Sequence, residues 1–115
     1  MRKKNYKGRC KKRTLDKCRG ICKTYDTLQS HYADTLQLDS QIKEFQCNVP
    51  LDCLDFGEYT TDFLCIMENG GMMVRECVSR DHLTKPMTAK LLDISRNYWL
   101  NRGVKDWGLV INAEK

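Results

Sequence analysis

Two acidic residues, Asp62 and Glu76, lie in segments whose residue pattern predicts neighbouring β-strands. Asp62 comes early in the segment 59–67 and Glu76 lies inside the segment 72–78, and the turn Glu-Asn-Gly-Gly between them is typical of a hairpin. A hairpin would bring the two carboxylates together, and converging hard oxygen ligands suit Mg²⁺ and the cleavage of phosphodiesters. The alternative is structural: a strand-end cap at Asp62 and an edge residue at Glu76 that pairs with an arginine.

The seven cysteines of the chain fall into two groups. Four of them lie in or beside predicted strands, where a free cysteine packs as a small hydrophobe; these are Cys47, Cys53, Cys65 and Cys77. The odd count and the irregular spacing speak against a disulfide framework. The other three are Cys10, Cys18 and Cys22, in a C-x7-C-x3-C pattern that matches no common zinc motif. A metal site of a small regulator, built on these three residues, is the weakest of the hypotheses.

Positive charge is concentrated at the N-terminus. Residues 1–25 hold eleven Lys and Arg against one acid, whereas residues 26–115 hold nine against fourteen. A basic segment of this kind favours contact with a polyanion such as DNA through its phosphates. The residues expected to make this contact are Arg2, Lys3, Lys4, Lys7, Arg9, Lys11, Lys12 and Arg13.

Length and composition indicate a single globular domain. The chain has 115 residues, of which 41% are hydrophobic and 30% are charged. It holds no apolar stretch long enough to span a membrane, and no apolar segment follows the basic start Met1-Arg2-Lys3-Lys4. We therefore expect no membrane partner and a cytoplasmic protein that could associate with the nucleoid.

Hydrophobic periodicity predicts an α-β-β-β-α-β order. We expect a basic N-terminal arm over residues 1–24, with a short helix over 14–22, and an α/β domain over residues 25–115. The elements predicted in this domain are a helix over 28–38 capped by Asp26 or Thr27, strands over 42–49, 59–67 and 72–78, a helix over 88–102 introduced by Pro86, and a strand over 107–112.

In this order the sequence resembles the PD-(D/E)xK nucleases, and in particular the catalytic domain of the TnsA-type endonucleases of cut-and-paste transposons. The resemblance covers about residues 25–112 and rests on Tyr-Thr-Thr-Asp-Phe-Leu (59–64), Val-Arg-Glu-Cys-Val (74–78) and Gly-Val-Lys-Asp-Trp-Gly-Leu-Val-Ile (103–111). It implies a restriction-endonuclease-like core with a mixed sheet, Mg²⁺ or Mn²⁺ as cofactor, DNA as substrate and a transposase subunit as partner. Asp62 and Glu76 would be the metal ligands.

The sequence departs from the family pattern at two positions. Val78 occupies the place of the lysine in the E-x-K motif, which lies on the same strand face as the acid. Gln29 occupies the place of a glutamate on the first helix. Arg80 or Lys90 could return a positive charge to the site. The first hypothesis is therefore a mobile-element DNA endonuclease subunit, and the alternative is a catalytically decayed module of the same fold that binds DNA or a transposase.

Overall fold

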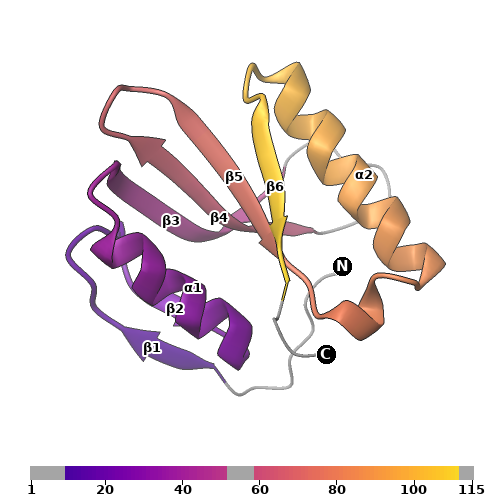
Figure 1. Cartoon of the computed structure of the whole chain (residues 1–115), viewed down its shortest axis with the longest axis horizontal. Helices are drawn as coiled ribbons and strands as arrows, with labels where there is room; N and C mark the ends of the chain where they lie inside the picture. The colour runs from indigo at the N-terminus through magenta and orange to yellow at the C-terminus, as the bar shows by residue number, and fades with distance from the viewer. Residues whose placement is uncertain (1–9, 52–58, 112–115) are drawn as a thin grey trace.

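The computed structural model describes residues 10–51 and 59–111, which form a compact α/β fold (Figure 1). The elements are β1 (Lys11–Arg13), β2 (Cys22–Thr24), α1 (Thr27–Leu38), β3 (Ile42–Pro50), β4 (Thr60–Met67), β5 (Met72–Cys77), the 3-10 turn η1 (Arg80–His82), α2 (Pro86–Asn101) and β6 (Asp106–Val110). A four-stranded sheet has the order β3-β4-β5-β6, antiparallel except for the parallel pair of β5 and β6, and β1 and β2 form a separate antiparallel pair. The predicted α-β-β-β-α-β order and the mixed sheet are confirmed.

The two helices begin where their residue types predict. The carboxylate of Asp26 accepts the backbone N–H of Gln29 at 2.9 Å, so Asp26 is the N-cap of α1, one of the two caps predicted. Helix α2 begins with Pro86, whose fixed φ suits the first turn. It ends before Gly103, which has φ +86°, a backbone conformation that favours glycine.

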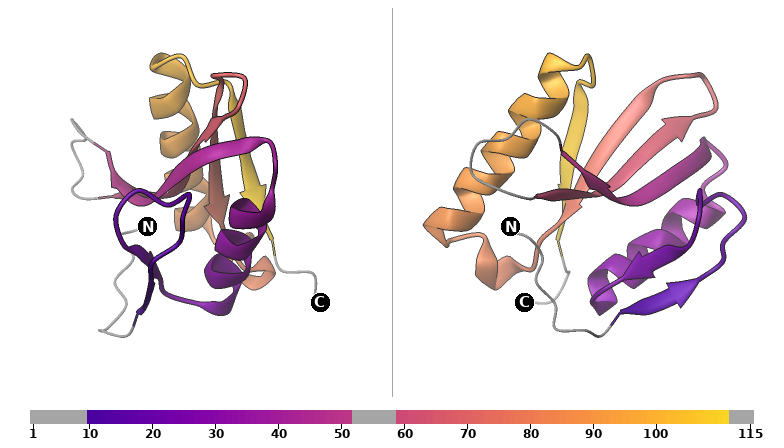
Figure 2. Two further views of the ribbon diagram at one scale, coloured as in Figure 1. Left: turned by 90° about the vertical axis from the view of Figure 1, so that its left-hand side faces the viewer. Right: turned by 180° about the vertical axis from the view of Figure 1, so that it is seen from behind.

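The helices lie on opposite sides of the sheet (Figure 2). On one side, α1 packs Ala33 and Leu36 against Phe45 and Phe63. On the other side, α2 packs against the sheet in a second apolar cluster. Leu91 and Trp99 of α2 pack there with Leu51, Tyr59, Val74 and Val104. The sheet therefore has two buried faces, which explains why its strands are mostly apolar.

At one point along β3 and β4, the side chains change the face of the sheet on which they lie. Cys47 packs on the α1 side and Val49 on the α2 side, although two residues at this spacing in a regular strand share a face. Asn48 between them has φ +55°, which turns the strand over. The partner strand does the same, since Phe63 packs on the α1 side and Thr61 bonds Trp99 of α2. Asp62 lies at this switch.

The helix predicted over residues 14–22 is wrong. Residues 10–24 form the β1–β2 pair and its connecting loop, and Cys18 and Cys22 of this segment are buried in the cluster on the α1 side. The backbone N–H of Arg19 donates to the carbonyl of Phe45, and that of Phe45 to the carbonyl of Lys17, both at 2.9 Å. These bonds to β3 hold the segment in a non-helical conformation. A helix of nine residues would have been too short to be stable alone.

Neither described helix combines the length and apolar character needed to cross a membrane. The basic residues Arg2 to Arg9 and Cys53 lie outside the described residues.

Candidate functional site

Asp62 and Glu76 meet between β4 and β5, and both are almost completely buried, at 2% and 1% exposure. Backbone pairing of the two strands runs from Ile66 with Met72 to Phe63 with Arg75. Just beyond this ladder the carboxylates connect the strands: the N–H of Asp62 donates to Glu76 Oε1 at 3.0 Å, and the N–H of Cys77 donates to Asp62 Oδ2 at 2.7 Å. Where backbone pairing ends, the side chains of the two acids thus accept the N–H groups of the neighbouring strands.

The helices supply one further donor to each acid. From α1, Gln29 Nε2 donates to Asp62 Oδ1 at 3.2 Å, and Gln29 is itself held by its Oε1, which accepts the N–H of Tyr25. From α2, Ser95 Oγ donates to Glu76 Oε2 at 2.7 Å. All four oxygens of the two acids therefore accept a hydrogen bond from the chain, which offsets the cost of burying these polar groups.

A second layer of bonds holds Ser95. Trp107 Nε1 on β6 donates to Ser95 Oγ at 3.0 Å, so that a chain of hydrogen bonds runs from β6 through α2 to Glu76. Ser95 was not among the site residues predicted from the sequence. A signal was present, because a serine with Leu91, Leu92 and Trp99 at helical spacing lies on the buried face of α2.

The structure brings Gln29, Asp62 and Glu76 together, and it keeps the candidate cations at the surface. Val78, at the place of the motif lysine, is buried. Arg80, on η1, and Lys90, in the first half of α2, have exposed side chains. The side chain of Lys90 makes no hydrogen bond or ion pair with any residue of the described ranges.

The described part of the basic segment has two kinds of cation. Lys11 and Lys12 are exposed on β1, where a phosphate could reach them. Arg13 is half-buried: its guanidinium contacts Asp34 at 2.6 Å and the carbonyl of Ser30 at 3.2 Å. Arg13 therefore fixes β1 to α1, a structural role that its place in a run of basic residues did not indicate.

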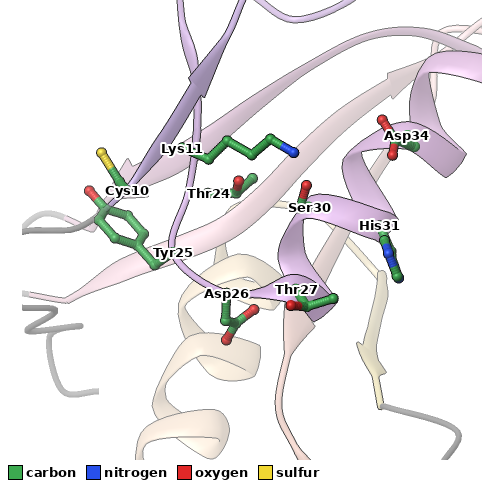
Figure 3. Close-up of a pocket in the computed structure, with 9 residues that line it drawn as sticks. All are labelled: Cys10, Lys11, Thr24, Tyr25, Asp26, Thr27, Ser30, His31 and Asp34. Atoms are coloured by element: carbon green, nitrogen blue, oxygen red, sulfur yellow. The ribbon is translucent and has the colours of Figure 1, made fainter.

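A surface pocket of about 480 Å³ lies between the β1–β2 pair and the start of α1 (Figure 3). Its lining mixes charges of both signs, with Lys11 on one side and Asp26, His31 and Asp34 on the other. Neither acid of the buried pair lines it. The pocket therefore does not add to the chemistry of Asp62 and Glu76.

Three thiols form a second group of reactive side chains. The Sγ atoms of Cys18, Cys22 and Cys47 lie within 4.8 Å of one another. Desolvation by burial raises the pKa of Cys18 to about 12, and a hydrogen bond with Cys47 raises the pKa of Cys22. The same bond from Cys22 stabilises the thiolate of Cys47 and lowers its pKa to about 6. The sequence placed Cys18 and Cys22 in one group but suggested only packing for Cys47, because the fold that joins the three is not encoded by their spacing.

The two sites suit different metals. Asp62 and Glu76 offer hard carboxylate oxygens, which fit Mg²⁺ or Mn²⁺, although such an ion would replace hydrogen bonds that the oxygens now accept. The thiols are soft ligands and do not suit Mg²⁺.

Comparison with known proteins finds no matching family model and no curated protein that resembles the chain closely enough to be a relative.

Proposed function

We propose that this chain is a DNA-acting protein of a mobile element, with a TnsA-type, restriction-endonuclease-like core in which Asp62 and Glu76 bind a divalent cation. The observation that carries the proposal is the contact between Gln29, Asp62 and Glu76. These residues come from α1, β4 and β5, and they occupy the three positions that the resemblance assigns to the site. The order of the elements and the mixed sheet also fit this core.

Each residue of the site has a separate task in this proposal. Mg²⁺ or Mn²⁺ bound at the acid pair would polarise a phosphodiester and activate water. Asp62 and Glu76 supply the negative charge that attracts the cation, while Gln29 and Ser95 fix the orientation of the two carboxylates. The basic N-terminal residues bind phosphates without reading sequence and hold the duplex in register. A transposase subunit as partner and a place in the cytoplasm belong to the same proposal.

A second candidate is a decayed module of the same fold that binds DNA or a transposase without cleaving. Two observations favour it. The motif lysine is replaced by the buried Val78, and every oxygen of the acid pair is already hydrogen-bonded by the chain. In this version the acids hold β4, β5 and the helices together, and function depends on the basic surface alone.

Plasmid cleavage separates the two candidates. Supercoiled plasmid is incubated with the full chain in Mg²⁺ or Mn²⁺, and in EDTA as the metal-free control. The nuclease proposal predicts nicking that requires the metal and disappears in Asp62→Asn and Glu76→Gln, two substitutions that keep the shape of the side chain. Asp93→Asn is the matched control, because it removes an exposed carboxylate from α2 and should leave nicking unchanged.

The outcome also identifies the missing cation. If the site is active, either Arg80→Ala or Lys90→Ala should lower the rate strongly, by about a hundredfold or more for a group that stabilises the transition state. No nicking by the wild-type chain in either metal would contradict the nuclease proposal. Duplex binding in a gel-shift assay would then support the decayed module. In that case Val78→Lys, which returns an ammonium to the strand face of Glu76, is the variant expected to restore metal binding or nicking.

A further inference from the structure

We propose that Cys18, Cys22 and Cys47 form a binding site for a thiophilic metal ion, with Zn²⁺ as the ion of best fit. Cys18 lies in the loop between β1 and β2, Cys22 is the first residue of β2, and Cys47 lies in the middle of β3. An ion bound by all three would link the β1–β2 pair to β3 of the sheet. The site is separate from the acid pair and does not depend on the proposed function.

The spacing of the sulfur atoms agrees with coordination. Cys18 Sγ and Cys47 Sγ are 4.0 Å apart, and all three Sγ atoms lie within 4.8 Å of one another. A tetrahedral zinc with Zn–S bonds of about 2.3 Å separates its sulfurs by about 3.8 Å. The three thiols therefore need to move little to bind one ion. A disulfide would use only two of them and requires a sulfur separation of about 2.05 Å.

The environment distinguishes these cysteines from one that only packs. Cys65 is fully buried in the apolar cluster of the α1 side and does not belong to the thiol group. Cys18 and Cys22 are buried in the same cluster, but their Sγ atoms lie within 4.8 Å of each other and of the Sγ atom of the half-buried Cys47. Packing alone gives no reason for three polarizable thiols to converge.

The backbone already holds the three ligands in place. The loop containing Cys18 is tied to β3 by the two hydrogen bonds that join Lys17 and Arg19 to Phe45. Asn48, next to Cys47, donates from its side chain to the carbonyl of Lys23, next to Cys22, at 2.9 Å. Such bonds keep ligands at fixed positions before the metal arrives, as the hydrogen bonds that surround the ligands do in other metal sites.

The surrounding charge suits a zinc ion with three thiolates. Such a complex carries one net negative charge, and three cationic residues flank the cysteines in the sequence: Lys17, Lys23 and Arg19, the last of which pairs with Glu44. Among the residues that the structure describes, no histidine or carboxylate joins the group. Three thiolates leave the fourth position of a tetrahedral zinc to a further ligand.

The experiment uses the full chain, reduced and freed of metal, in a titration with Co²⁺. Co²⁺ bound by thiolates gives visible bands and a near-ultraviolet charge-transfer band, and we expect these to saturate at one ion per chain and to disappear when Zn²⁺ displaces Co²⁺. Cys47→Ser and Cys22→Ser should weaken binding by at least about a hundredfold, because removal of a ligand costs more than removal of a hydrogen bond that orients one. Cys10→Ser is the matched control, and its binding should be unchanged.

Protection of the wild-type thiols gives an answer even if the variants do not fold. The reduced chain is alkylated with and without Zn²⁺, and mass spectrometry measures the labelling of each cysteine. We expect Zn²⁺ to slow labelling of Cys47 and to leave the half-buried Cys10 unaffected. Absence of both the cobalt bands and the zinc-dependent protection would overturn the proposal, as would equal loss of binding in Cys10→Ser. Plasmid cleavage has no part in these readings, so the outcome is independent of the nuclease proposal.

Discussion

Ser95 is a small residue whose hydroxyl connects Trp107 to the buried carboxylate of Glu76. Ser95→Ala removes one donor from that carboxylate and the acceptor of the indole N–H. Because buried polar groups that lose a partner are costly, we expect a loss of about 1–3 kcal/mol in the free energy of unfolding. Urea denaturation followed by circular dichroism measures this value. Ser40→Ala, at an exposed position, is the control, and an equally small effect of both substitutions would show that the hydroxyl contributes nothing to holding Glu76.

Cys47 should be the most reactive thiol of the cluster in the metal-free chain. Its pKa is lowered to about 6, so the nucleophilic thiolate predominates above that pH, and protonation slows the reaction as the pH falls through it. The pKa values of Cys18 and Cys22 are raised, so both remain thiols at neutral pH. Iodoacetamide labelling across a pH series, with mass spectrometry, should give a midpoint for Cys47 near 6. A midpoint near the ordinary thiol value of 9 would contradict the hydrogen-bonding scheme of the three thiols.

At the scale of elements, α1 matters because it carries Gln29 to the acid pair. Asp26→Ala removes the N-cap that holds the first turn of the helix. We expect a loss of about 1 kcal/mol in the free energy of unfolding, the usual effect of losing such a cap. Chemical denaturation measures it, with Thr27→Ala at the exposed neighbouring position as the control. A change no greater than that of the control would mean that the helix begins without help from Asp26.

The elements that could be predicted from the sequence are those with a strong local signal. Alternating apolar residues and the Gly-Gly turn predicted the β4–β5 hairpin, and Pro86 and Gly103 marked α2. The β1–β2 pair was missed because its two strands have three residues each, and its stability depends on contacts with β3 that are distant in the sequence. The i, i+4 spacing of Cys18 and Cys22 fits a helix and also fits two residues that meet across a loop.

The candidate site could be predicted only in part for the same reason. Asp62 and Glu76 lie on two strands joined by a tight turn, so their meeting follows from local structure. The convergence of Cys47 with Cys22 depends on how the β1–β2 pair packs against β3, and the role of Ser95 depends on how α2 packs against the sheet. Neither arrangement can be read from residue spacing.

At the scale of the whole molecule, the basic N-terminus and the acidic remainder make a strongly asymmetric charge distribution. If the N-terminus binds the DNA backbone, substitution of Lys3, Lys4 and Lys7 by Gln should weaken duplex binding at low salt. It should also reduce the slope of log Kobs against log salt concentration by about 0.9 for each phosphate that is no longer neutralised. Fluorescence anisotropy with a labelled duplex at several salt concentrations measures both effects.

A matched variant makes this prediction specific. Substitution of Lys43, Lys85 and Lys105 by Gln changes the net charge equally, at three exposed positions outside the N-terminal segment. That variant should keep most of the affinity and of the slope. Equal reductions in the two triple variants would show that total charge, and not the N-terminal segment, determines binding.

Calorimetric titration of the reduced, metal-free chain with Mn²⁺ tests the acid pair directly, because Mn²⁺ is a hard ion that carboxylate oxygens bind in preference to the soft thiols of the cysteine cluster. If Asp62 and Glu76 form a metal site, the wild-type chain and Asp93→Asn should each bind one Mn²⁺, and Glu76→Gln should bind none, with circular dichroism to show that this variant is folded. No binding of Mn²⁺ to the wild-type chain at millimolar concentration, or binding that Glu76→Gln leaves intact, would show that Asp62 and Glu76 do not form a metal site.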